Sequence, residues 1–331
     1  MQMRTIRICI YYIGGAKMKR RIIYIVLSFI LLISLAGCMS DENDKNSETK
    51  PIITTTLFPQ YDFTNIIVGD KFEVVLLLPP GVEAHSYELS PKDMKTLLSS
   101  DIFIYTGEAM EPWVSNILET LEKEDIYVLD LSENIKLESF NYQSHDDLDH
   151  EDSQYDPHYW TDPMNAKIMV DEILKAVVSI DKNNEEYYNQ NANKLKDDLD
   201  RLDEDIKRVV NNSESNTIIS GGHFALGYFA NRYGLEYISP YEGFSPNAEP
   251  SAQAIAKIMK IVKETGAKAI FYEELIDPKI AKTISEQTGI EMLELNAAHN
   301  VSKEQLETGI HYVDIMYKNL DNLKKGLGYH E

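Results

Sequence analysis

Past residue 50 the chain alternates short apolar runs with stretches whose apolar positions recur at helical spacing. Runs rich in β-branched and aromatic residues predict strands at 52–56, 72–78, 101–106 and 126–131. The stretches between them predict helices at 59–68, 91–99 and 112–121. After residue 215 the pattern repeats, with strands predicted at 217–220, 236–239, 268–273 and 291–295 and helices at 224–233, 251–265, 278–287 and 303–327. Two such blocks predict an α/β fold with two parallel-sheet (βα)4 lobes and helices on both sheet faces.

Between the two blocks lies a charged segment, 181–212, in which apolar residues recur at helical spacing, at positions 195, 199, 202 and 206. We expect it to form one long backbone helix that holds the lobes in a fixed relation. The predicted organisation is therefore an N-terminal α/β lobe over 51–180, the linking helix over 181–212 and a C-terminal α/β lobe over 213–331.

The N-terminal segment has the features of a secretory signal. Residues 18–38, MKRRIIYIVLSFILLISLAGC, place basic residues before a short apolar run and small residues before Cys38. The ending LAGC resembles a bacterial lipobox, which predicts a signal peptide over 1–37, with Met18 as the true start, and lipidation of Cys38. The polar residues after it predict a flexible tether over 38–50. We expect a protein held by lipid at the outer face of the cytoplasmic membrane.

Charge and cysteine content narrow the class of ligand. Residues 1–37 contain six Lys or Arg and no acid, so the rest carries 26 basic and 54 acidic residues, a net charge of about −28. Such a charge argues against nucleic acid and anionic lipid surfaces as ligands and is compatible with a cation. The two cysteines, Cys9 and Cys38, leave the predicted globular part without a disulfide.

Four of the eight histidines follow predicted strands, and this is the main chemical signal in the sequence. His85 and His158 follow the second and fourth strands of the first lobe, and His223 and His299 follow the first and last strands of the second. Open α/β sheets bind ligands outside the carboxyl ends of their strands, so these imidazoles are expected to converge between the lobes. The glycines before His223 allow close backbone approach. A single histidine more often caps a helix or packs in a loop, but four at matching strand ends predict a metal site.

Imidazole ligands favour zinc over calcium or magnesium, which prefer oxygen. Zinc accepts four nitrogen ligands tetrahedrally. His158 lies in DPHYWTDP, 156–163, where each Asp-Pro pair predicts rigid, non-helical backbone. We interpret this segment as a stiff loop that holds the imidazole in place for a metal.

Five separated segments resemble the metal-binding lipoproteins of bacterial ABC-type zinc and manganese importers. They occur in that family's order and are AHSYELSP (84–91), GEAMEPWV (107–114), DPHYWTDP (156–163), GGHFALGYFANRYGL (221–235) and SPNAEPSAQ (245–253). The resemblance, over about 51–328, implies that His85, His158 and His223 are metal ligands and that the lobes close little about their helix. It also implies that the chain delivers zinc to an ABC permease with its ATPase subunit. We expect the chain to be a monomer and not an enzyme.

The chain departs from the family pattern at the fourth ligand. Members similar to this chain usually have an acidic residue where LNAAHNVS supplies His299, so Glu273 and Glu274 remain alternatives to it. Manganese members place a glutamate where this chain has His223, which favours zinc as the cargo and leaves manganese or another divalent metal as the alternative.

The acidic stretch 141–157 contains His145 and His150. It predicts either a solvated loop or an accessory segment that collects zinc near the tight site. Two other functional classes are alternatives to transport. A zinc hydrolase needs an open coordination position and a general base, and the chain has no H-E-x-x-H motif. A surface adhesin, a role proposed for lipoproteins that resemble this family, remains as a second role.

Overall fold

A four-stranded parallel sheet forms the first lobe of the structure, a computed structural model that describes residues 50–139, 155–223, 225–241 and 250–331. Its strands are β1 (Ile52–Thr55), β2 (Glu73–Leu76), β3 (Ile102–Tyr105) and β4 (Tyr127–Asp130), in the order β2-β1-β3-β4. The helices of this lobe are α2 (Phe58–Val68), α3 (Pro91–Leu97) and α4 (Leu118–Lys123). Strand β3 is buried along its whole length, as expected of a central parallel strand.

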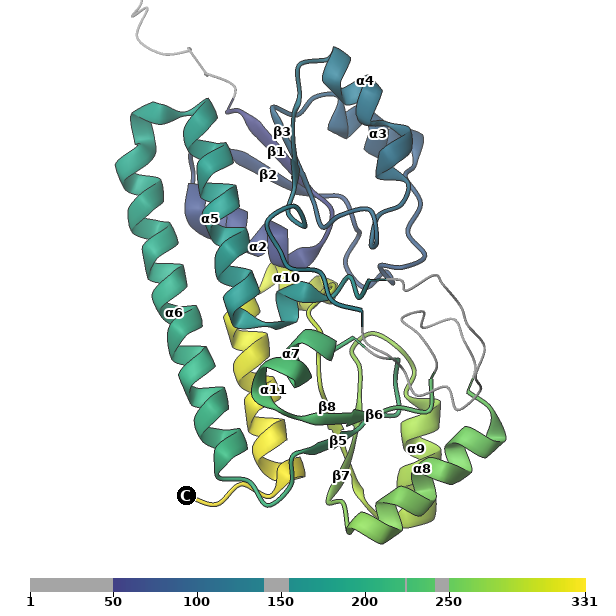
Figure 1. Cartoon of the computed structure of the whole chain (residues 1–331). Coiled ribbons are helices and arrows are strands. Elements are labelled where there is room, and N and C mark those ends of the chain that lie inside the picture. Colours follow the sequence, from purple (N-terminus) through teal and green to yellow (C-terminus); the bar gives the residue numbers. More distant parts are fainter. Residues whose placement is uncertain (1–49, 140–154, 224, 242–249) are drawn as a thin grey trace, which may run out of the picture. The chain divides into compact units, whose positions relative to one another are not determined.

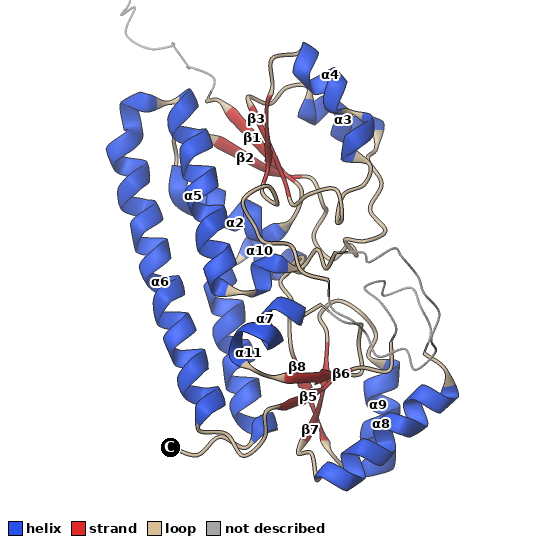
Figure 2. Cartoon of the chain, in the orientation of Figure 1, coloured by secondary structure: helices blue, strands red, loops and turns tan. Residues whose placement is uncertain are grey.

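The second lobe contains two parallel strand pairs rather than the single sheet expected (Figure 2). They are β5 (Thr217–Ile219) with β6 (Glu236–Ile238), and β7 (Ala269–Tyr272) with β8 (Glu291–Glu294). One isolated bridge, Ser220 to Phe271, connects the pairs, because β5 is only three residues long and ends before a continuous ladder can form. The helices are α7 (Gly227–Tyr233), α8 (Ala252–Thr265), α9 (Lys279–Thr288), α10 (Lys303–Glu307) and α11 (Tyr312–Leu327).

A long helix, α6 (Glu185–Asn211), links the lobes and confirms the expected backbone helix. It packs against α2 of the first lobe and α11 of the second (Figure 1). Its buried apolar residues recur at helical spacing and lie on one face: Ala192, Leu195, Leu199, Leu202, Ile206 and Val209. Both lobes therefore pack against the same helix.

Four predictions about helices were incomplete or wrong. The predicted helix 112–121 is a 3-10 turn (Val114–Asn116) followed by the short helix α4. An 18-residue helix that packs against α6, α5 (Pro163–Ile180), was not predicted. Its first residue belongs to the second Asp-Pro pair, so this pair is not the non-helical backbone expected: Asp162 caps the helix and Pro163 occupies its first position. The predicted helix 303–327 is two helices, because Gly309 adopts a left-handed φ of 72° between them. Within the described residues every helix is too short or too polar to cross a bilayer.

Candidate metal centre

The structure brings the four predicted histidines together. His85 extends from the loop after β2, His158 precedes a short 3-10 turn (Tyr159–Thr161), and His223 and His299 follow β5 and β8. One ring nitrogen from each lies within 4.8 Å of the others. His158, His223 and His299 are buried, and His85 is partly exposed. Each lobe therefore contributes two imidazoles to one cluster.

The cluster fits a tetrahedral metal ion. Zinc bound at about 2.0–2.1 Å by four nitrogens holds them about 3.3 Å apart. The Nε2 atoms of His85 and His158 are already 3.1 Å apart. The Nε2 atoms of His223 and His299 are buried and have no hydrogen-bond partner among the described residues. Buried polar atoms are normally paired, so these nitrogens point to a ligand that completes the site.

Carboxylates contact the outer nitrogen of three of the four rings. Asp156 Oδ1 accepts a hydrogen bond from His158 Nδ1 at 2.6 Å, and Glu274 Oε1 accepts one from His299 Nδ1 at 2.9 Å. Glu273 Oε2 contacts Nδ1 of His223. A carboxylate at Nδ1 fixes the tautomer that leaves the Nε2 lone pair facing the metal. Glu273 and Glu274, the alternatives to His299, thus lie behind the rings.

Burial and the mutual repulsion of the rings keep two imidazoles neutral. Burial lowers the pKa of His85 to about 2 and the pKa of His158 well below its usual value, and the neighbouring histidines lower both further. These two rings therefore present lone pairs at neutral pH.

Two other groups at the site have raised pKa values. Burial alone would lower the pKa of His299, but the hydrogen bond and charge of Glu274 outweigh it and raise this pKa. Burial raises the pKa of Asp156 to about 8. Without metal, the proton on His299 therefore competes with a cation for the same cluster.

The His158 segment is held by one local hydrogen bond and by hydrogen bonds to residues far away in the sequence. Asp156 Oδ1 also accepts from the backbone N–H of His158 at 2.9 Å. The indole Nε1 of Trp160 donates to the carbonyl of Ala297 at 2.8 Å, and the hydroxyl of Tyr312 donates to the carbonyl of Trp160 at 2.6 Å. The expectation of a stiff loop at His158 agrees with these contacts.

Side chains that sequence reasoning missed hold the loop of His299. Asn319 receives a hydrogen bond from the backbone N–H of Asn296 at 2.8 Å and donates one to its carbonyl at 2.7 Å. The side chain of Asn296 accepts from the N–H of Ala298, which has a φ of 60° although it is not glycine. Such strain persists only where surrounding contacts over-determine the backbone. The sequence signal for these contacts is the pair of asparagines, Asn296 and Asn300, that flank residues 297–299.

The glycines before His223 allow the close approach expected of them. A Cβ at Gly221 would lie 2.7 Å from the backbone of Ala281 in α9, and one at Gly222 would lie 2.9 Å from Glu273 Oε1. Any side chain at Gly222 would therefore separate Glu273 from His223. The two glycines allow His223, which follows β5, to lie close to Glu273 in the loop that follows β7.

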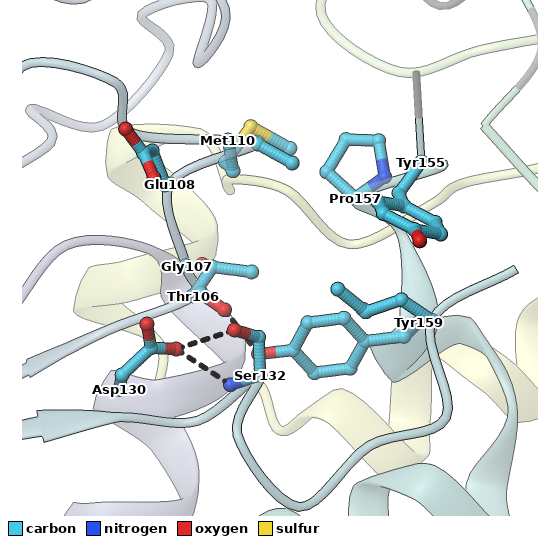
Figure 3. Close-up of a pocket in the computed structure, with 11 residues that line it drawn as sticks. Thr106, Gly107, Glu108, Met110, Asp130, Ser132, Tyr155, Pro157 and Tyr159 are labelled. Atoms are coloured by element: carbon cyan, nitrogen blue, oxygen red, sulfur yellow. Dashed lines mark hydrogen bonds between the residues drawn. The ribbon is translucent and has the colours of Figure 1, made fainter. Parts of the chain in front are cut away.

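A separate pocket of about 340 Å³ lies in the first lobe, beside the His158 loop (Figure 3). Pro157 and Tyr159 line it, and none of the four clustered histidines does. Glu111 of the segment GEAMEPWV follows the pocket residue Met110 in sequence; it is buried and accepts hydrogen bonds from the hydroxyl of Thr56 and the backbone N–H of Gly107. Burial raises the pKa of Glu111 to about 7. This carboxyl holds its own loop through these hydrogen bonds and is not part of the cluster.

Some predicted features lie outside the described residues. They are the lipidation site Cys38, the signal segment and the accessory histidines His145 and His150.

Relatives of this chain bear names connected with zinc. The chain is 34% identical over 310 residues to the high-affinity zinc uptake system protein ZnuA of Bacillus subtilis, covering 92% of this chain and 97% of that protein. It is 30% identical over 307 residues to the zinc-binding lipoprotein AdcA of Streptococcus pneumoniae, covering 92% of this chain but only 60% of AdcA.

Solved structures that resemble this chain also include metal-binding proteins. The Zn(II)-bound ZnuA-like domain of pneumococcal AdcA matches with a TM-score of 0.72 and 30% identity, covering 84% of this chain and 99% of that domain. The laminin-binding protein Lmb of Streptococcus agalactiae, described as bifunctional with adhesin and metal transporting activity, matches with a TM-score of 0.70 and 27% identity, covering 83% of this chain and all of that one. The family model described as zinc-uptake complex component A, periplasmic, matches residues 53–326, and this chain belongs to that family.

Proposed function

We propose that this chain binds one zinc ion through His85, His158, His223 and His299 and delivers it to an ABC-type permease and its ATPase subunit. The observation that carries the proposal is the cluster itself. Four ring nitrogens from two lobes lie within 4.8 Å of one another, and the buried Nε2 atoms of His223 and His299 have no hydrogen-bond partner among the described residues. Membership of the zinc-uptake family supports the transport role.

Zinc is the cargo that the donor set favours. Four imidazoles suit zinc better than manganese, which binds oxygen ligands more readily. Four neutral ligands leave the charge of the ion uncompensated, and the carboxylates of Asp156, Glu273 and Glu274, each in contact with a ligand ring, supply negative charge next to it. Four protein ligands also fill a tetrahedral shell and leave no position for a reacting water, which favours carriage over catalysis.

The protein works outside the cytoplasm, as its family does. We further propose that lipid on Cys38 anchors it at the outer face of the cytoplasmic membrane as a monomer, and that His145 and His150 form an accessory zinc-collecting segment. Adhesion as a second role is supported by the likeness to the Streptococcus agalactiae protein.

Isothermal titration calorimetry on metal-free protein tests the zinc proposal. We expect one tight zinc equivalent and much weaker binding of manganese. A protein without a tight zinc equivalent, or one that prefers manganese, would contradict the proposal. Loss of the tight equivalent in His223→Ala, with unchanged secondary structure by circular dichroism, would locate it at the cluster.

A further inference from the structure

His85 differs from the other three imidazoles of the cluster. The carboxylates of Asp156, Glu273 and Glu274 contact the Nδ1 atoms of the other three rings, whereas the His85 ring is hydrogen-bonded through its Nε2 to the Nε2 of His158. The backbone N–H of His85 donates to Glu83, two residues earlier in the same loop. The position of the His85 ring therefore depends on the interactions that hold its loop, residues 79–87.

One buried side chain of the second lobe holds that loop. The amide nitrogen of Asn300 donates to the carbonyls of Pro79 at 2.8 Å and Val82 at 2.9 Å. Beside it, the N–H of Gly81 donates to the carbonyl of Val301 at 2.9 Å. The loop that carries His85 is thus bound to the residues that directly follow His299.

Every hydrogen-bonding group of the Asn300 side-chain amide has a partner. Its Oδ1 accepts from the N–H of Val301 at 2.8 Å, and both amide protons are used by the two carbonyls. Only an amide at this position can accept one hydrogen bond and donate two. The side chain is 1% exposed, so water cannot replace a lost partner. Removing the amide leaves two buried carbonyls of the His85 loop unpaired.

We propose that Asn300 is a positioning residue for zinc: it holds the His85 loop of the first lobe against the His299 loop of the second. This inference rests on the proposed zinc function. Asn300 lies next to His299, so a single residue couples a ligand loop from each lobe. The cluster is then assembled before the ion arrives, and the ion does not have to order the loop on binding.

A residue that only stabilised the fold would have the same contacts, so the test must separate the two roles. If Asn300 acts through His85, its effect on zinc affinity disappears once His85 is gone. If it acts on the fold in general, its effect is the same with or without His85. A double-mutant cycle on zinc affinity makes this distinction.

The experiment compares Asn300→Asp, His85→Ala and the double variant in the full chain, with zinc affinity measured by competition against a chelator. Aspartate keeps the size of the side chain but cannot donate to two carbonyls. We expect Asn300→Asp alone to weaken zinc binding about 10- to 100-fold, the range for groups that orient metal ligands. In the His85→Ala background the same change should weaken it less than about twofold.

The matched control is Asn191→Asp, which removes an amide-to-carbonyl bond from α6 to Ile67 in α2, away from the cluster. It should leave zinc affinity unchanged. If Asn300→Asp does not fold by circular dichroism, Asn300→Ser, which can donate to one carbonyl, takes its place and should weaken binding by a smaller factor.

Wild-type affinity in the Asn300 variant, or a loss that recurs in full without His85, would overturn the inference while leaving zinc binding intact. A wild-type protein that binds no zinc would overturn the proposed function together with it.

Discussion

Replacing Glu274 by glutamine tests whether the carboxylates behind the rings matter to the metal. Glu274 is buried and accepts three hydrogen bonds, from His299 Nδ1 at 2.9 Å, from the N–H of Ala297 at 2.9 Å and from the N–H of His299 at 3.3 Å. Glutamine retains the shape but has one acceptor oxygen and a donor group in place of the other. At least one buried donor therefore faces a donor, and the negative charge next to His299 is lost.

The size of the effect follows from these contacts. Outer partners of metal-bound histidines contribute about 10- to 100-fold to metal affinity, or about 1.4–2.7 kcal/mol. A buried donor left without an acceptor costs about 1–3 kcal/mol of folding stability. We therefore expect Glu274→Gln to raise the zinc dissociation constant 10- to 100-fold and to lower the melting temperature of the metal-free protein.

The assay is chelator competition for zinc, with Glu291→Gln as the matched control, because Glu291 is an exposed glutamate at the start of β8. The control removes the same charge at the surface, where screening makes it unimportant. If the two variants bind zinc within a factor of two of each other, the carboxylate behind His299 does not support the ligand and the reasoning is refuted.

Three further outcomes are expected. Zinc binding at pH 7 should release one or two protons, from His299 and Asp156, whose pKa values are raised; His85 and His158, whose pKa values are low, should release none. Calorimetry in buffers of different ionisation enthalpy counts the released protons. Zinc affinity should fall as the pH falls through the raised pKa of His299. Ala298→Val should destabilise the protein by more than about 1 kcal/mol in urea titrations, because Ala298 has a φ of 60°, whereas Ala298→Gly should be neutral or stabilising. Deleting 143–154 should remove weak zinc equivalents but leave the tight site; a deletion that abolishes tight binding would show that the roles of loop and cluster were reversed.

The convergence of the histidines could be predicted because it follows from topology. Parallel strands present their carboxyl ends at one edge, so a histidine after each of several strands tends to reach one place. The predicted strands agree with the structure to within a few residues because each is a short apolar run between polar turns. Helix α6 was predicted from its single apolar face.

The groups that hold the histidines could not be predicted in the same way. Asn300 contacts Pro79 across more than two hundred residues, and no local spacing signals such a pair. Helix α5 has a local signal, Asp162 as cap and Pro163 at the first position, but an Asp-Pro pair also predicts a rigid loop. The same residues that end a loop also begin a helix, and the apolar spacing beyond Pro163 decides between them.

A crystal structure of the zinc-loaded protein, with diffraction data collected on both sides of the zinc absorption edge, tests the central claim most directly. We predict one zinc ion held by nitrogens of His85, His158, His223 and His299 at about 2.0–2.1 Å, with Glu274 still bonded to the outer nitrogen of His299. A carboxylate oxygen of Glu273 or Glu274 bound to the metal in place of His299, or no zinc at the cluster, would contradict this account.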